Sequence, residues 1–154
     1  MTSQMYQIII SKLKEMGFVH YEISNFAKDS YESKHNLIYW NLDEYLGLGA
    51  SAASLYKGYR IYNSKLLTNY MFNNDIIKEE ILIENQKGEF FWLGLRKING
   101  VSIDRYKELF NSDPFTDFDI NALIDKKLLQ LDNDILKLTP FGLEHGNYVF
   151  SYFI

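Results

Sequence analysis

The stretch YEISNFAKDSYESKHNLIYWNLDEYLGLGASAAS, from Tyr21 to Ser54, decides how the rest of the chain is interpreted. It begins with the aromatic and β-branched residues of a strand, continues as a polar segment that holds one histidine, His35, and ends in a run of small residues. This order is typical of a strand whose end presents a loop to a ligand.

The segment before the loop is predicted to be a helix followed by a strand. Hydrophobic residues recur at helical spacing over 4–16, and Gly17 stands where a C-terminal cap is expected. Residues 19–26 are predicted to form one strand. A helix followed by a strand is the unit of a (β/α) barrel or of an open parallel sheet.

Residues 27–46 carry no clear period and are predicted to be loop, with a helical turn over 42–46. Residues 75–83 fit a strand or a helix equally well. Between these segments the pattern predicts two strands and a helix, over 47–56, 59–63 and 66–72, with a turn at Lys57-Gly58 between the strands.

From about Glu84 the chain is predicted to form a small helical module without a Pro/Gly linker before it, so the two parts of the chain are expected to pack together. The predicted elements are a helix ending at Lys97, a second helix capped by Ser102, a third capped by Asp117 or Asp119, a hairpin of residues 129–131 and 135–138, and a closing helix that starts at Thr139-Pro140. Together these elements make a winged-helix-like module.

The composition limits the classes of protein to consider. Of the 154 residues, 47% are hydrophobic, which is enough for a buried core. A net charge of −4 disfavours a phosphate-binding surface. No apolar run approaches the roughly 20 residues that span a bilayer, and the N-terminus lacks the layout of a signal peptide, so a cytoplasmic location is expected.

Four motifs carry a resemblance to a known family. They are EISNFAK at 22–28, SKHNLIYW at 33–40, EYLGLGA at 44–50, and GLR at 94–96 followed by GVS at 100–102. On these motifs the chain resembles the C-terminal part of the oxygen-independent coproporphyrinogen III oxidase-like radical S-adenosylmethionine proteins, and among them the haem chaperone branch. It departs from the family where Asp29-Ser30 replace the usual Pro-Gly, and where Ser51 and Ala53 replace a frequent glycine and histidine.

The resemblance implies an α+β fold. Residues 1–83 would form the closing strands of a radical S-adenosylmethionine partial (β/α) barrel, and residues 84–154 a winged-helix-like domain. For the full-length parent it implies S-adenosylmethionine, a 4Fe-4S cluster and haem as cofactors. The cluster needs cysteine thiolates, and this chain contains no cysteine, so the cluster cannot bind it. The chain is expected to be a C-terminal fragment that is inert alone, the alternative being a complete small protein with a borrowed fold.

The run of small residues over 47–53 is open to two interpretations. Small side chains let a backbone approach a ligand, and they equally let a strand pack tightly inside a fold. The resemblance implies that Ala27 and Ala53 line the S-adenosylmethionine pocket. Neither side chain can be catalytic. Glu22 and Asn25 are expected on opposite faces of the strand, so paired-carboxylate catalysis is not expected either.

His35 is the side chain best suited to bind a metal. Neutral imidazole binds haem iron, and Tyr31, Tyr39 and Trp40 would flank a flat macrocycle. The resemblance implies a haem contact at the H-N-x-x-Y-W pattern. The alternative is a structural histidine that hydrogen-bonds to the backbone of the loop.

The function favoured by the resemblance is that of a haem chaperone in haem or porphyrin metabolism, with a tetrapyrrole and the missing N-terminal barrel as partners. One alternative is oxidative decarboxylation of coproporphyrinogen III, and another is a stand-alone winged-helix module that binds proteins or DNA. Residues 88–154 hold seven Lys/Arg and ten Asp/Glu, a net charge of −3, so no nucleic-acid partner is expected.

Overall fold

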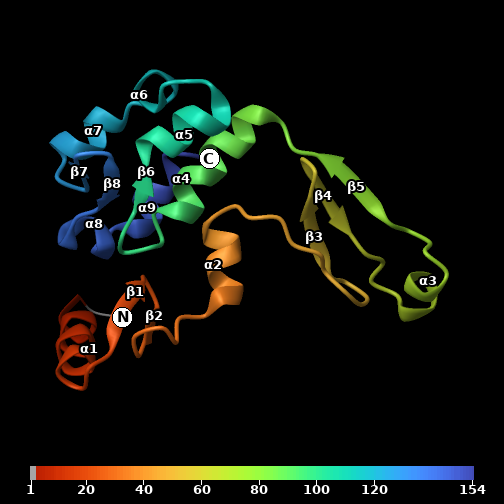
Figure 1. Ribbon diagram of the computed structural model, residues 1–154, viewed down its shortest axis with the longest axis horizontal. Coiled ribbons are helices and arrows are strands. Elements are labelled where there is room, and N and C mark those ends of the chain that lie inside the picture. The colour runs from red at the N-terminus through yellow and green to blue at the C-terminus, as the bar shows by residue number, and fades with distance from the viewer. Residues whose placement is uncertain (1–2) are drawn as a thin grey trace.

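The computed structural model describes residues 3–154, which form helices and three small antiparallel sheets (Figure 1). The helices are α1 Ser3–Glu15, α2 Lys34–Trp40, α3 Leu67–Met71, α4 Ile83–Gly94, α5 Ile103–Phe110, α6 Pro114–Asp117, α7 Ile120–Asp125, α8 Pro140–Glu144 and α9 Gly146–Ser151. The strands are β1 Val19–Glu22, β2 Asn25–Ala27, β3 Ala53–Tyr56, β4 Tyr59–Tyr62, β5 Ile77–Glu80, β6 Val101–Ser102, β7 Leu129–Asp132 and β8 Ile135–Leu138. The mixed helix and strand content agrees with the expected class.

The first helix is confirmed, but the single strand predicted over 19–26 is wrong. The chain reverses direction after Glu22, and β1 pairs with β2 as an antiparallel hairpin. The Glu22 carboxylate accepts hydrogen bonds from the backbone N–H of Ser24, at 3.2 Å, and from the side-chain amide of Asn25. These bonds hold the reversal, so Glu22 and Asn25 are partners across the hairpin and do not point to opposite faces.

The predicted loop over 27–46 contains a helix that the sequence pattern did not predict. Helix α2 begins after Ser33, whose hydroxyl accepts a hydrogen bond from the backbone N–H of Asn36 at 3.3 Å. The helical turn predicted over 42–46 is wrong. Tyr45 instead pairs in an isolated antiparallel bridge with Leu55.

Strands β3, β4 and β5 form a sheet that extends away from the rest of the molecule (Figure 1). The predicted turn at Lys57-Gly58 is confirmed, and both residues have positive φ angles, of 50° and 77°. Helix α3 confirms the helix predicted over 66–72. The segment 75–83 contains a strand, because β5 pairs with β4. The predicted strand over 47–56 is shorter than expected, since only its last four residues are in β3.

The C-terminal part has most of the predicted elements, including their caps. Ser102 caps α5, Asp119 caps α7 and Thr139 caps α8, each accepting a hydrogen bond from a backbone N–H of its helix. Strands β7 and β8 form the predicted hairpin, and β6 adds a third strand in the order β6-β8-β7. Three features were not predicted: strand β6, the short helix α6, and the break at His145 that divides the closing helix into α8 and α9.

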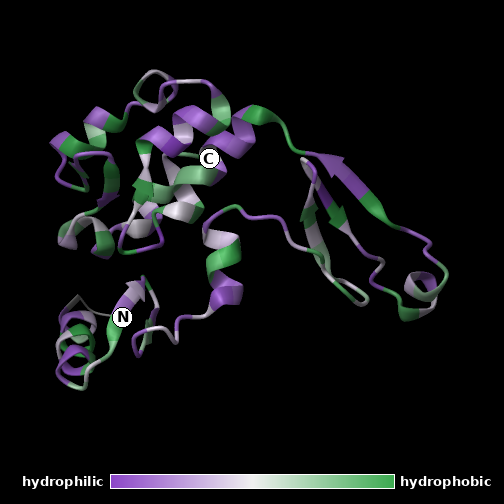
Figure 2. Cartoon of the chain, in the orientation of Figure 1, coloured by the Kyte–Doolittle hydropathy of each residue, from purple (hydrophilic) through white to green (hydrophobic). Residues whose placement is uncertain are grey.

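The hydrophobic core lies almost entirely in this C-terminal part. Phe91 is fully buried, with its ring centroid 4.7 Å from that of Phe153 and 5.2 Å from that of Tyr106. Figure 2 shows that α4 starts with a hydrophobic residue, continues as a hydrophilic stretch and ends in a more hydrophobic second half, which supplies the aromatic centre of the core. No helix among residues 3–154 has the length and apolar character needed to cross a membrane.

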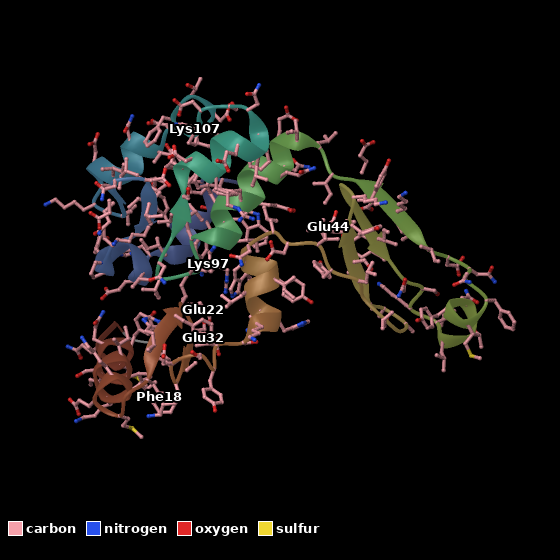
Figure 3. All side chains as sticks on the ribbon, viewed as in Figure 1. Phe18, Glu22, Glu32, Glu44, Lys97 and Lys107 are labelled. Carbon is pink, nitrogen blue, oxygen red and sulfur yellow. The ribbon has the colours of Figure 1, made fainter. Side chains whose placement is uncertain are left out.

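The two parts of the chain pack together, as expected from the missing linker. The backbone N–H of Ile23 donates to the carbonyl of Arg96 at 3.0 Å, and that of Ile98 donates to the carbonyl of Tyr21 at 3.1 Å. Figure 3 shows Glu22 and Lys97 at this junction, where their backbones form an isolated bridge. The junction fixes the N-terminal hairpin against the end of α4.

Candidate functional site

A groove of about 500 Å³ lies between α2, the second half of α4, and strands β3 and β4. This volume is within the range of small-molecule sites in proteins. Four aromatic side chains and two arginines contribute to its lining: Tyr39, Trp40, Tyr45, Trp92, Arg60 and Arg96. We call this set of residues the aromatic groove. Its walls come from segments far apart in the sequence.

Tyr45 is fixed in the groove by its backbone and by a neighbouring ring. Its N–H donates to the carbonyl of Leu55 at 2.9 Å, and the N–H of Leu55 donates back at 3.0 Å. The Tyr45 ring lies 4.6 Å from that of Tyr39, at 74°. Burial raises the pKa of the Tyr45 hydroxyl, although the positive charge of Arg60 acts in the opposite direction. The Tyr45 hydroxyl therefore stays neutral at physiological pH.

His35 lies on the exposed side of α2, one helical turn before Tyr39. Its Nε2 atom shares a hydrogen bond of 3.2 Å with the Tyr39 hydroxyl, and the two rings meet edge to face at 4.9 Å. Tyr39 in turn lines the aromatic groove. His35 itself does not line the groove, and its ring bonds to Tyr39, a lining side chain of its own helix.

The two arginines of the groove differ in their electrostatic surroundings. Arg60 donates to the Glu89 carboxylate at 3.0 Å. Burial alone would lower the Arg60 pKa, but the charge and the hydrogen bond of Glu89 raise it above the ordinary value. Arg96 has no ion pair with any carboxylate among residues 3–154, and its Nε atom is buried without a hydrogen-bond partner there.

Residues 84–145 match the family described as the HemN C-terminal domain. Over 99% of its length, the chain is 36% identical to the heme chaperone HemW of Lactococcus lactis subsp. lactis (strain IL1403) and 37% identical to that of Bacillus subtilis (strain 168). The chain is therefore similar to the HemN C-terminal domain over residues 84–145 and to heme chaperones along its length. It spans 42% of the length of each of these two relatives.

A solved structure shares the fold of this chain. It is the coproporphyrinogen III oxidase HemN of Escherichia coli, a radical SAM enzyme. The match has a TM-score of 0.69 and covers 96% of this chain and 39% of that one. At 14% sequence identity, the likeness shows the fold alone.

The structure does not bring the two predicted alanines together. Ala27 is buried at the end of β2, opposite Val19, and Ala53 is half-buried at the start of β3, opposite Tyr62. Strands β2 and β3 belong to different sheets and lie apart in Figure 1. Neither alanine lines the aromatic groove.

Of the aromatic residues predicted to flank a macrocycle, Tyr39 and Trp40 line the groove, and Tyr31 does not. Tyr31 is 81% exposed, in the segment before α2. Sequence reasoning missed Arg60 and Trp92, since no local motif distinguishes them. Arg96 lies within the GLR motif of 94–96, which was noted for its family resemblance but not for its chemistry.

Metal-binding groups are sparse in the part of the chain that the structure describes. There, no three His, Cys, Asp or Glu side chains lie close enough together to hold a metal ion. The whole chain has no cysteine, so these residues do not fit an iron–sulfur cluster. His35 offers one exposed imidazole, which is bonded to Tyr39 of the groove lining.

Proposed function

We propose that this chain is the tetrapyrrole-binding part of a haem chaperone, and that haem lies in the aromatic groove. The observation that carries the proposal is the 36–37% identity, over 99% of the chain, with two proteins named heme chaperone. The likeness to the coproporphyrinogen III oxidase, at 14% identity, carries no comparable weight. The chain spans less than half of each relative, so the complete chaperone would need further segments.

The groove has the chemistry that a flat, apolar macrocycle with charged side groups requires. Aromatic side chains offer large apolar faces for stacking, and Tyr39, Trp40 and Trp92 provide three of them. Arg60 and Arg96 bring cationic groups to the same lining. The residues present therefore fit haem.

His35 is the proposed axial ligand. The nitrogen that would meet iron, Nε2, is the one that now shares a hydrogen bond with the Tyr39 hydroxyl. Ligation in the neutral form would leave the proton on Nδ1 and release that hydroxyl to water or to the ligand. Because the histidine is exposed, this exchange needs no rearrangement of the core.

The remaining expectations from the family resemblance are also proposals. Residues 1–83 would complete a radical S-adenosylmethionine barrel whose missing N-terminal part supplies the cluster cysteines, and residues 84–154 would be its winged-helix-like domain. Ala27 and Ala53 would contact S-adenosylmethionine by backbone and methyl packing. The cytoplasm is the proposed location. The helix order and the three-stranded sheet of the C-terminal part support the domain assignment.

His35→Ala is expected to weaken haem binding roughly 10-fold and to shift the main absorption band, because the axial bond is lost while stacking remains. The measurement is a haem titration of the chain, followed by visible absorption. His145→Ala is the matched control, since the His145 ring meets that of Phe141 edge to face and does not line the aromatic groove.

Equal spectra and affinities for the chain and for His35→Ala would show that His35 is not a ligand. A chain that does not bind haem at micromolar concentrations would contradict the proposed function itself.

A further inference from the structure

The side chain of Arg96 lies between two aromatic rings and has no acidic partner. Its guanidinium carbon is 4.5 Å from the centre of the Trp40 ring and 5.7 Å from that of Phe150. No carboxylate among residues 3–154 forms an ion pair with it. Its Nε and the Nε1 of Trp40 are buried, and neither finds a hydrogen-bond acceptor within that part of the chain.

Two unpartnered donors side by side are unusual in a folded protein. Buried polar groups are nearly always hydrogen-bonded, and the exceptions need an explanation. The position of Arg96 just after α4 gives some stabilisation from the helix dipole, and the rings add cation–π attraction. Neither effect supplies an acceptor for the five N–H donors of a guanidinium.

The groove next to Arg96 lacks negative charge. No Asp or Glu side chain lines it, and the nearby Glu89 is already paired with Arg60 at 3.0 Å. Arg96 also lines a cavity of about 390 Å³ on the side of α8 and α9, but Glu144 lines that cavity and disfavours an anion there. An anion that binds Arg96 is therefore best accommodated from the aromatic groove.

We propose that Arg96 binds a carboxylate side group of the tetrapyrrole in the aromatic groove, with the Trp40 indole N–H as a neighbouring donor. This inference rests on the proposed function and adds to it the part of the ligand that is recognised. The planar guanidinium presents parallel N–H donors that match the two oxygens of a carboxylate. Stacking on Trp40 orients the guanidinium plane before the ligand binds.

The test compares haem with its dimethyl ester, in which both carboxylates are blocked, by visible titration of the 154-residue chain. The chain is expected to bind haem about 10-fold more tightly than the ester, since hydrogen bonds to a charged group are among the stronger ones. Arg96→Met is expected to bind the two ligands equally. Arg105→Met is the matched control, because Arg105 is exposed and outside the groove, and it should keep the preference.

The outcomes test separately the proposed haem binding and the proposed contact between Arg96 and a carboxylate. Equal affinities of the unchanged chain for haem and ester would overturn the inference while leaving haem binding in place. A preference that survives in Arg96→Met would show that the carboxylate is held elsewhere and that Arg96 only stacks on Trp40 and Phe150. A chain that binds neither ligand would overturn the proposed function as well.

Thermal unfolding shows whether Arg96→Met is folded. If Arg96→Met shows no unfolding transition, the preference for haem over the ester is measured in Arg96→Lys instead. A lysine keeps the charge but cannot donate two parallel hydrogen bonds, so the preference for haem is expected to fall at least about 3-fold. An unchanged preference in Arg96→Lys would overturn the bidentate contact.

Discussion

Phe91→Ala is expected to lower the free energy of unfolding by about 3–5 kcal/mol, the range found for buried phenylalanines replaced by alanine. Phe91 has no exposed surface, and its ring contacts those of Phe90, Tyr106, Phe118 and Phe153, with centroids 4.7–5.6 Å apart. Alanine at this position leaves a cavity at the centre of the aromatic core, which the surrounding helices can fill only in part.

Thermal unfolding measures the effect, and the midpoint is expected to fall by about 6–20 °C for a chain of this size. Phe72→Ala is the matched control, because Phe72 is 75% exposed beyond α3. Its midpoint should change little. Equal shifts for the two variants would show that the core does not centre on Phe91.

Gly142→Ala is expected to destabilise the protein by about 2–3 kcal/mol, as overpacking against a rigid neighbour does. A Cβ atom at Gly142 would lie 1.9 Å from the carbonyl oxygen of Leu128. That carbonyl also accepts the backbone N–H of Thr139 at 3.0 Å, so it cannot move freely. Helix α8 would have to lift away from the hairpin β7-β8.

Gly146→Ala provides the control four residues further on. Its Cβ would meet no atom closer than 3.4 Å, and that atom belongs to the ring of Phe150. Alanine there should be neutral or slightly stabilising, because alanine favours helices over glycine by up to about 1 kcal/mol. The two midpoints measured by denaturant titration should therefore separate. Equal midpoints would contradict the close contact at Leu128.

Elements with a local signal in the sequence were predictable. The caps at Ser102, Asp119 and Thr139 rely on short polar side chains directly before hydrophobic runs, and the structure confirms all three. The turn at Lys57-Gly58 also has a local signal, because a glycine accommodates the positive φ that the turn requires. In each case the stabilising contact lies within a few residues.

Elements held by longer contacts were missed. Helix α2 has only seven residues and none that is fully buried, so its periodic signal is short, and it is held by packing on α4. The reversal after Glu22 has no glycine or proline. It depends on the Glu22 carboxylate, which bonds to Ser24 and Asn25. A strand pattern alone does not reveal such a side-chain bond.

The candidate site was predictable only in part. Tyr39 and Trp40 follow His35 closely in the sequence, which makes them predictable, and both line the groove. Trp92 and Arg96 come from α4 and the residues just after it, so their arrival at the same groove is a property of tertiary packing. The roles of His35, Ala27 and Ala53 stay predictions.

The backbone hydrogen bond between Ile23 and Arg96 gives the molecule a mechanical link between its two parts. The N–H of Ile23 in the hairpin turn bonds to the carbonyl of Arg96, whose guanidinium lines the groove. The hairpin and the groove therefore meet at one residue. Any coupling between binding at the two places would be reciprocal, each event changing the affinity of the other by the same factor.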